Sequence, residues 1–388
     1  MHELLMVKYG EVMLKGNNRP FFVNTLIRNI RDALADTGTY HIRKGQSVLY
    51  VEPRAEADLD RAAERIKKVF GVHVFHRTLK VEKDMEAIRS HSLRYFESIL
   101  KESRSFKIEA RRSDKDFPYR SMEMNTMLGQ LMVDHFSHLK VDVHDPDVTL
   151  YVNVRKDGVY LYRDKERGPG GLPVGTSGRA MVLMSGGIDS PLAAWLIARR
   201  GVRLDAVHFH SYPYTGERSK KKVMRLAQQL APYTGSFRLH IFPFTRIQEA
   251  VAEHCPPGEV TIIMRRMMMK SAEKLAARTR SQALVTGESI GQVASQTMEG
   301  LTVTNAAVNL PVFRPLVGMD KEEIVDWTRR IGTYSISIEP YEDCCTLFVP
   351  RHPQTKPRLE RVEASESKVD FEALIDEALE GVEVVNNA

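Results

Sequence analysis

The chain has 388 residues, which is more than one ordinary domain needs and predicts two or three domains. Hydrophobic residues make up 43% of the sequence, so packed cores are expected and wholesale disorder is excluded. The net charge of +6 suits a polyanionic partner such as nucleic acid, although many basic enzymes bind none.

The three cysteines, Cys255, Cys344 and Cys345, form no CxxC pair, which argues against a disulfide framework and a zinc site. We therefore expect no metal ligand set in the protein, and a reducing, cytoplasmic location. No apolar run approaches the ~18 residues of a membrane span, and the N-terminus lacks the apolar core of a signal peptide. We expect no membrane partner.

Residues 1–58 predict a small α+β domain. They read as a strand and turn, a helix and a returning strand, in "ELLMVKYGEVMLKG", "RPFFVNTLIRNIRDAL" and "HIRKGQSVLYVEP".

Residues 59–165 predict a second α/β domain. A helix is expected to end at Gly71, the C′ position. Strand and helix patterns then alternate in "VFHRTLKV", "DMEAIRSHSLRYFESILKE", "SFKIEARRSDKDFP" and "SMEMNTMLGQLMVDHF". A β-hairpin follows, with its turn at Asp157-Gly158.

Residues 166–179, rich in glycine and proline, predict a linker or an ordered loop over a site. From 180 to 388, short apolar strands alternate with long helices, which predicts a doubly wound parallel sheet. Ligands of such sheets bind beyond the carboxyl ends of the strands. The charged tail 358–388 is expected to be peripheral.

The stretch "VLMSGGIDSPLAAW" (182–195) reads as a strand, a tight turn and a helix with Pro191 in its first turn. Gly186 and Gly187 allow backbone amides to approach a bound group, and the helix N-terminus favours an anion. The turn resembles the PP-loop of the ATP pyrophosphatases. That resemblance implies that Asp189 helps to bind a magnesium ion carried by the phosphates, with hydroxyl donors from Ser185 and Ser190. The alternative is a glycine-rich turn with an Asp-Ser helix cap.

Other stretches offer further contacts to a nucleotide. Gly287 ends a second strand and Gln296 follows it, in what could equally be an ordinary loop. Arg265 stands in the methionine-rich helix "IIMRRMMMK", where the methionines are expected in the core and the arginine could reach a phosphate. His208 and Phe209 end a strand whose backbone could contact adenine, although a core phenylalanine is the simpler interpretation.

A basic run with interleaved aromatic residues is compatible with RNA binding, through cations on phosphates and rings on unpaired bases. By itself the pattern favours the alternative, a solvated strand face with the aromatic residues in the core. The cations are Arg104, Lys107, Arg111, Arg112, Lys115 and Arg120, and the rings are Phe106, Phe117 and Tyr119.

Taken together, the chain resembles the tRNA sulfurtransferases that make 4-thiouridine. The resemblance rests on "YGEVMLKGNNR", "IEARRSDKDFPYRSMEMNTMLGQ", "GGLPVGTSGR", "MSGGIDSP", "VTGESIGQVASQT", "RPLVGMDKEEI" and "EPYEDCCTLFVPRHPQTKP". It implies a ferredoxin-like domain (1–58), an RNA-binding THUMP domain (59–165), the linker (166–179) and a PP-loop domain (180–388).

The resemblance also implies the site and the reaction. ATP would adenylate a uracil oxygen of tRNA with release of pyrophosphate, and a persulfide sulfur would then displace AMP. Cys344 aligns best with the family's catalytic thiol, and Cys345 remains an alternative. The implied ATP contacts are Leu183, Met184, Ser185, Gly186, Gly187, Asp189, Ser190, His208, Phe209, Arg265, Gly287 and Gln296.

As partners we expect the tRNA acceptor end, a cysteine desulfurase or other persulfide donor, and a second copy of the chain in a homodimer. Some family members carry a C-terminal rhodanese domain, and this sequence matches the form without it. The family's link to the thiazole of thiamine depends on that domain in such members. Two alternative functions remain open. The protein could be an ATP-dependent ligase that transfers an amine, or an RNA-binding protein with a vestigial PP-loop.

Overall fold

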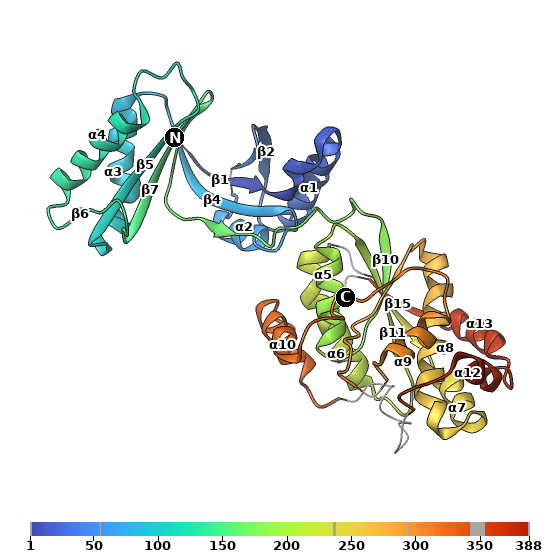
Figure 1. Ribbon diagram of the computed structural model, residues 1–388. Coiled ribbons are helices and arrows are strands. Elements are labelled where there is room, and N and C mark those ends of the chain that lie inside the picture. Colours follow the sequence, from blue (N-terminus) through green and yellow to red (C-terminus); the bar gives the residue numbers. More distant parts are fainter. Residues whose placement is uncertain (1, 55, 236–237, 294, 342–353, 387–388) are drawn as a thin grey trace. The chain divides into compact units, whose positions relative to one another are not determined.

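The computed structural model describes the chain except for residues 1, 55, 236–237, 294, 342–353 and 387–388. The chain divides into two compact units, residues 1–171 and 172–388. Each has its own sheet and its own helices, and each is described separately (Figure 1).

The first unit is built on one nine-stranded sheet with the strand order β2-β3-β1-β4-β8-β7-β5-β6, and β9 pairs with β4. Strand β4 pairs with β1 on one side and β8 on the other, so the sheet is continuous. The strands are β1 (His2–Tyr9), β2 (Tyr40–Gly45), β3 (Val48–Pro53), β4 (Val72–Val81), β5 (Ser105–Arg112), β6 (Lys140–Val141), β7 (Val148–Arg155), β8 (Gly158–Tyr162) and β9 (Glu166–Arg167).

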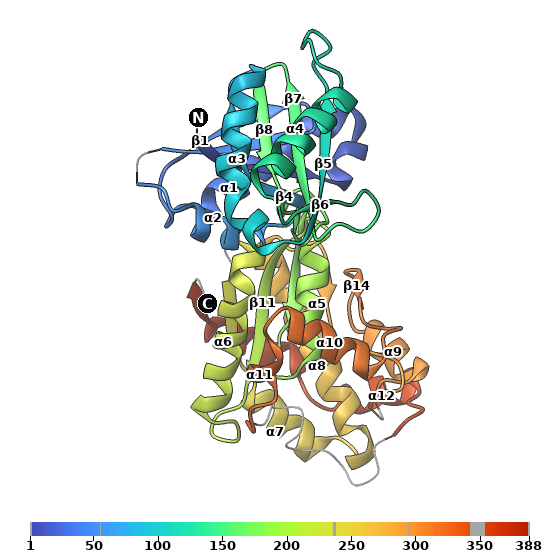
Figure 2. The same ribbon diagram turned by 90° about the vertical axis from the view of Figure 1, so that its left-hand side faces the viewer.

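The helices of this unit are α1 (Arg19–Ala33), α2 (Leu59–Ile66), α3 (Met85–Glu102) and α4 (Ser121–His135). Helices α3 and α4 lie on one face of this sheet (Figure 2). They bury their apolar sides on β4, β5, β7 and β8 in one cluster that contains Phe96, Phe106 and Leu128. The predicted hairpin is confirmed, because β7 and β8 pair antiparallel across Asp157-Gly158. The helix expected to run to Gly71 is shorter, since α2 ends at Ile66 and tight turns follow.

The opposite face of this sheet is filled by tyrosine pairs. Tyr50 stacks on Tyr160 with ring centroids 5.0 Å apart, and Tyr151 stacks on Tyr162 at 4.9 Å. These rings are all buried and form a second apolar cluster. His76, which is fully buried, lies against Tyr162 and donates from Nδ1 to the carbonyl of Asp164 at 2.8 Å.

His76 is expected to make the first unit less stable in mild acid. Burial lowers the pKa of His76 to about 4, and the charges of Lys8 and Lys165 add to the effect. An unfolded histidine takes up a proton below about pH 6.5, whereas the folded one does not. Stability should therefore fall by up to about 3 kcal/mol as the pH drops from 6.5 to 4.

Denaturant unfolding followed by far-UV circular dichroism at pH 7.5 and 5.0 measures this loss, with His76→Phe as the variant that cannot titrate. The pH-dependent part of the unfolding free energy should shrink in the variant. An equal pH dependence in the two proteins would show that another group is responsible.

The second unit is a doubly wound sheet, as predicted, with the strand order β14-β13-β10-β11-β12-β15. Neighbouring strands from β14 to β12 are parallel, and β15 runs antiparallel to β12. The strands are β10 (Arg179–Leu183), β11 (Arg203–His210), β12 (Arg238–Pro243), β13 (Leu284–Val285), β14 (Val312–Phe313) and β15 (Glu383–Asn386).

Helices cover both faces of this sheet, with α5, α6 and α10 on one and α7, α8, α12 and α13 on the other (Figure 1). The chain passes from β10 to β11 and β12, then returns to β13 on the other side of β10. The helices are α5 (Asp189–Ala198), α6 (Glu217–Thr234), α7 (Thr245–His254), α8 (Val260–Thr279), α9 (Met298–Asn305), α10 (Lys321–Arg330), α11 (Tyr334–Ser337), α12 (Leu359–Glu366) and α13 (Phe371–Glu380).

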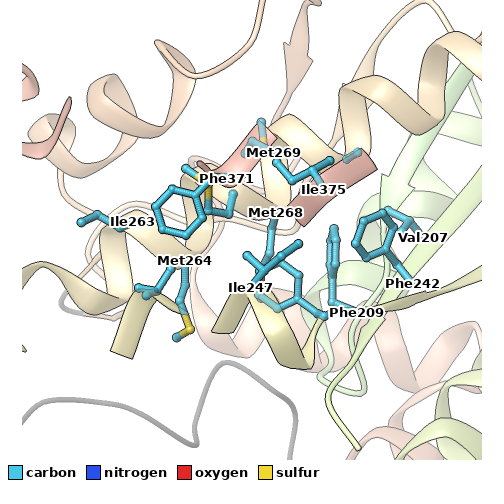
Figure 3. Packing of buried hydrophobic residues seen from close by; sticks show 14 of the residues in the cluster. Val207, Phe209, Phe242, Ile247, Ile263, Met264, Met268, Met269, Phe371 and Ile375 are labelled. Atoms are coloured by element: carbon cyan, nitrogen blue, oxygen red, sulfur yellow. The ribbon is translucent and has the colours of Figure 1, made fainter. Parts of the chain in front are cut away.

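The methionine-rich helix is a core element, as its composition predicts. Met264 and Met268 of α8 are buried among Phe209, Ile247 and Phe371 (Figure 3). Flexible thioether side chains fill the irregular space between the sheet and three helices.

The prediction that the charged tail is peripheral is wrong. Phe371, Ile375 and Leu379 of α13 belong to the same core, and β15 completes the sheet. The buried Glu366 of α12 pairs with the guanidinium of Arg266. The apolar stripe of α13 was therefore a better guide than the overall charge of the tail.

Candidate functional site

The glycine turn joins β10 to α5 at the carboxyl edge of the second sheet. The Ser190 hydroxyl closes it, accepting from the Ser185 amide at 2.9 Å and donating to the Ser185 carbonyl at 3.2 Å. The Gly187 amide donates to Ser185 Oγ at 3.3 Å. Both serine hydroxyls thus shape the turn at the N-terminus of α5, where a helix favours anions.

Gly287 fixes the distance between the turn and the loop after β13. A Cβ atom at this position would lie 2.7 Å from the Ser190 amide nitrogen and 2.8 Å from the Asp189 carbonyl carbon. Both are backbone atoms, so only glycine fits without displacing the turn.

Gly287→Ala is expected to weaken nucleotide binding about ten- to hundredfold, because the methyl group must push the turn away from its present position. Binding of a fluorescent ATP analogue measures this loss. Gly258→Ala is the matched control, since nothing lies within 4 Å of its added Cβ. Unchanged affinity in Gly287→Ala would contradict the close fit.

The strand ends beside the turn are tightly packed. His208 is buried and donates from Nδ1 to the Met184 carbonyl at 3.0 Å, which ties the end of β11 to the end of β10. The ring of Phe209 packs on Phe242 in the core, so only its backbone is available to a ligand (Figure 3). Leu183 is the last residue of β10 and is partly buried.

Arg265 of α8 is held by the loop that follows β13. Its Nη1 donates to Ser295 Oγ at 2.8 Å and to the Ser295 carbonyl at 3.1 Å, and its Nη2 pairs with Glu288. Glu288 is buried and also accepts from Arg314 Nε and Thr286 Oγ1, at 2.7 and 2.8 Å. The guanidinium of Arg265 is therefore fixed in position before any ligand arrives.

Asp189 is a half-buried carboxylate at the first position of α5. Burial raises its pKa, while the hydrogen bond from Gln292 and the positive charge of Lys321 lower it. Lys321 is the first residue of α10, so the positive charge that acts on Asp189 comes from the start of that helix.

Cys344 and Cys345 lie outside the described residues. The described residues on either side of them contact the site loops. Ser337 Oγ donates to the Gly187 carbonyl at 3.2 Å, and Thr297 Oγ1 donates to the Thr355 carbonyl at 2.7 Å. Thr297 directly follows Gln296.

Comparison with known proteins decides the family. Three family models match: "Thiamine biosynthesis protein (ThiI)" over residues 175–371, "ThiI ferredoxin-like domain" over 4–75 and "THUMP domain" over 82–164. A protein of Caldanaerobacter subterraneus subsp. tengcongensis named "Probable tRNA sulfurtransferase" is 51% identical over 97% of this chain and 98% of its own length. A protein of Acetivibrio thermocellus with the same name is 48% identical over 99% of each chain. The chain belongs to the tRNA sulfurtransferase family.

A solved structure agrees with this family membership. It is described as a 4-thiouridine synthetase–RNA complex with bound ATP, and it is 38% identical with a TM-score of 0.93 over 100% of both chains. As a member of the tRNA sulfurtransferase family, the protein is an enzyme.

The predicted RNA-binding cations of this sulfurtransferase lie on and around β5. Lys107 and Arg111 share one face of the strand, and the Arg104 side chain is 93% exposed. Arg112 Nη1 donates to the Phe117 carbonyl at 2.9 Å, which supports the loop that carries Lys115. The remaining member of the set, Arg120, precedes α4.

The aromatic residues of the run behave differently. Phe106 and Phe117 are buried in the core of the first unit, so the expectation that their rings stack on bases is wrong. Tyr119 is partly buried and packs on Phe117 with ring centroids 5.8 Å apart.

Four further residues belong to the candidate site and are not among those that the sequence predicts, namely Glu288, Gln292, Lys321 and Ser337. The first two stand inside "VTGESIGQVASQT" and Lys321 stands inside "RPLVGMDKEEI", so the motifs contained them without indicating their contacts. In the part of the chain that the structure describes, no three His, Cys, Asp or Glu side chains gather as a metal site. None of the helices described is both long and apolar enough to cross a membrane.

Proposed function

We propose that the enzyme binds ATP at the carboxyl ends of β10 and β13 and uses it to convert a uridine of tRNA to 4-thiouridine. Transfer of sulfur to tRNA is the activity after which the family is named. The observation that carries the proposal is the position of the glycine turn. It lies at the point where the strand order reverses, and Gly287 and Arg265 belong to elements that flank it.

ATP would lie across this edge with its phosphates at the turn. The backbone amides of residues 185–190 and the N-terminus of α5 would hold the phosphates, and the fixed guanidinium of Arg265 would add charge. The backbone at His208 and Phe209 would contact adenine. The close approach at Gly287 and the amide of Gln296 would border the same space.

Magnesium is part of the proposal, because the donors present fit it. Asp189 supplies a carboxylate beside the phosphate position, and hard oxygen ligands are those that Mg²⁺ prefers. When bound, the ion would neutralise charge on the phosphate chain. Asp189 would hold it, and Lys321 would contribute further positive charge.

The reaction then needs two displacements. Uracil O4 attacks the α-phosphorus, the bond to the β-phosphate oxygen breaks, and pyrophosphate leaves as the N3 proton is lost. Sulfur from a persulfide on Cys344 or Cys345 attacks C4, and AMP leaves with the former O4. A second thiol cleaves the S–S bond and becomes part of a disulfide, and N3 is reprotonated. Holding ATP and base in line is the enzyme's main contribution.

The sulfur would come from a cysteine desulfurase or another persulfide donor in the cytoplasm. A second use of the same persulfide, for the thiazole of thiamine, is supported only by the name of the family that matches residues 175–371, which refers to thiamine biosynthesis. We also propose that the enzyme works as a homodimer, so that RNA held by one copy can reach the second unit of another.

The first unit would hold the acceptor end of tRNA through the cations on and around β5. The double variant Arg104→Gln, Arg111→Gln is expected to show a weaker salt dependence of tRNA binding. The slope of log K against log[salt] should fall by about one unit per residue, because each phosphate contact that is lost reduces the number of counterions released on binding. Filter binding between 50 and 300 mM salt measures the slope. The same slope in the double variant would contradict the assignment.

ATP–pyrophosphate exchange tests the proposed function against its rivals. The enzyme should exchange only with unmodified tRNA present, whereas an RNA-binding protein with a vestigial turn would give no exchange. Cys344→Ser with Cys345→Ser should keep the exchange and form no thiouridine. Cys255→Ala, which removes the third thiol, should retain both activities. An enzyme that transfers an amine would remain fully active without Cys344 and Cys345.

A further inference from the structure

The side-chain amide of Gln292 lies directly opposite the Asp189 carboxylate. Its amide nitrogen lies 3.3 Å from Oδ1 and 3.4 Å from Oδ2 of Asp189, so both oxygens are almost equally distant. Both distances are at the long end for hydrogen bonds. The amide therefore occupies the position in front of the carboxylate without binding it tightly.

The other end of the same amide is unsatisfied. Gln292 Oε1 is buried and has no hydrogen-bond partner among the residues that the structure describes. Buried amide oxygens are normally paired, and an exception calls for an explanation such as an absent ion or water. The Gln292 amide nitrogen therefore makes two long hydrogen bonds to the half-buried Asp189 carboxylate. The buried oxygen of the same amide has no partner among the described residues.

The loop that carries Gln292 is well placed to bind at the site. The Gly291 amide donates to the Gln296 carbonyl at 2.9 Å, and the Gln296 amide donates to the Val293 carbonyl at 2.9 Å, so one backbone turn holds both glutamines. Arg265 binds Ser295 of the same loop. The position and rigidity of this loop therefore come from contacts that do not involve the Gln292 side chain.

We propose that Gln292 is the second protein ligand of the divalent cation, with its amide oxygen beside Asp189. A half-turn of the amide exchanges its oxygen and nitrogen. Two ligand oxygens at right angles, each about 2.1 Å from Mg²⁺, lie about 3 Å apart. The observed separation between the amide and the carboxylate is close to that value, so a cation fits between the two with little movement.

An amide suits this position because it can face Asp189 in two ways. Without a cation the N–H side satisfies the buried carboxylate, and with a cation the oxygen becomes a ligand. A second carboxylate there would repel Asp189 whenever the cation is absent. The amide also adds no negative charge beside the phosphates of ATP. The inference rests on the proposed function, since ATP brings the cation.

Binding of Mn²⁺, followed by electron paramagnetic resonance with a non-hydrolysable ATP analogue, tests the inference without relying on activity. Gln292→Leu should bind Mn²⁺ about ten- to hundredfold more weakly than the unmodified protein. Gln292→Glu, which restores an oxygen ligand, should bind it at least as tightly. Gln282→Leu is the matched control, because Gln282 accepts from the Arg179 amide at the other end of β10.

Binding of the analogue in EDTA separates the possible outcomes. Weaker Mn²⁺ binding in Gln292→Leu, with unchanged binding of the analogue in EDTA, supports the inference. Unchanged Mn²⁺ binding in Gln292→Leu, or weaker Mn²⁺ binding in Gln292→Glu, overturns it and leaves the proposed function intact. Equal loss of Mn²⁺ and of metal-free analogue in Gln292→Leu also overturns it. No binding of the analogue by the unmodified protein, with or without metal, overturns the proposed function itself.

Discussion

Replacing Asp189 with asparagine is expected to lower thiouridine formation by about 100- to 1000-fold, the usual effect of removing one group that stabilises charge at a reacting centre. The carboxylate is half-buried at the N-terminus of α5, beside Gln292 and in the field of Lys321. The amide of asparagine is nearly isosteric, so the turn should keep its shape while the charge is lost. Single-turnover formation of thiouridine, followed by its near-ultraviolet absorbance, measures the effect.

Asp326→Asn is the matched control, because this carboxylate is exposed on α10 of the same unit. It should retain full activity. A loss of less than fivefold in Asp189→Asn would mean that the carboxylate has no part in the reaction, and the nucleotide site would then have to be sought elsewhere.

Glu366→Ala is expected to destabilise the second unit by about 3–5 kcal/mol, the effect of removing one partner of a buried ion pair. Arg266 is 2% exposed and pairs with Glu366, while its Nη1 donates to the Val303 carbonyl. Lys270 also reaches Glu366, at 3.3 Å. Truncation would leave the buried guanidinium with the half-exposed carboxylate of Glu363, 3.4 Å away, as its remaining ion-pair partner among the described residues.

Tryptophan fluorescence in a denaturant titration reports on this unit selectively. The chain has two tryptophans, and both Trp195 and Trp327 lie in the second unit, 5.4 Å apart by ring centroid. Glu360→Ala, on the exposed side of α12, should change the midpoint little. A change of less than 1 kcal/mol in Glu366→Ala would indicate that solvent or another group compensates Arg266.

Local signals in the sequence were sufficient for much of the fold. The Asp157-Gly158 turn predicted the hairpin, and the apolar run before "SGGIDS" predicted the strand, turn and helix of the PP-loop. These features depend on neighbours in the chain, where backbone preferences and side-chain periodicity decide the structure. The interior position of Met264 and Met268 followed from composition in the same way.

Contacts between distant segments could not be derived in this way. The pairing of Arg266 with Glu366 joins positions 100 residues apart, and Gln292 meets Asp189 across 103 residues. The overall charge of the tail predicts a peripheral position, which is wrong because one side of α13 is apolar and packs into the core. Likewise, Phe106 and Phe117 carry no local signal that separates a core ring from one that stacks on RNA, and only packing decides.

In the proposed reaction, ATP held at the edge formed by β10 and β13 activates the uracil oxygen as an adenylate. The most direct measurement uses tRNA whose target uracil carries ¹⁸O at O4, with ATP and a persulfide donor, and analyses the released AMP by mass spectrometry. Adenylation at O4 predicts one ¹⁸O atom in AMP for each thiouridine formed. Unlabelled AMP alongside thiouridine would show that O4 is never joined to the α-phosphorus, and would contradict adenylation of the uracil.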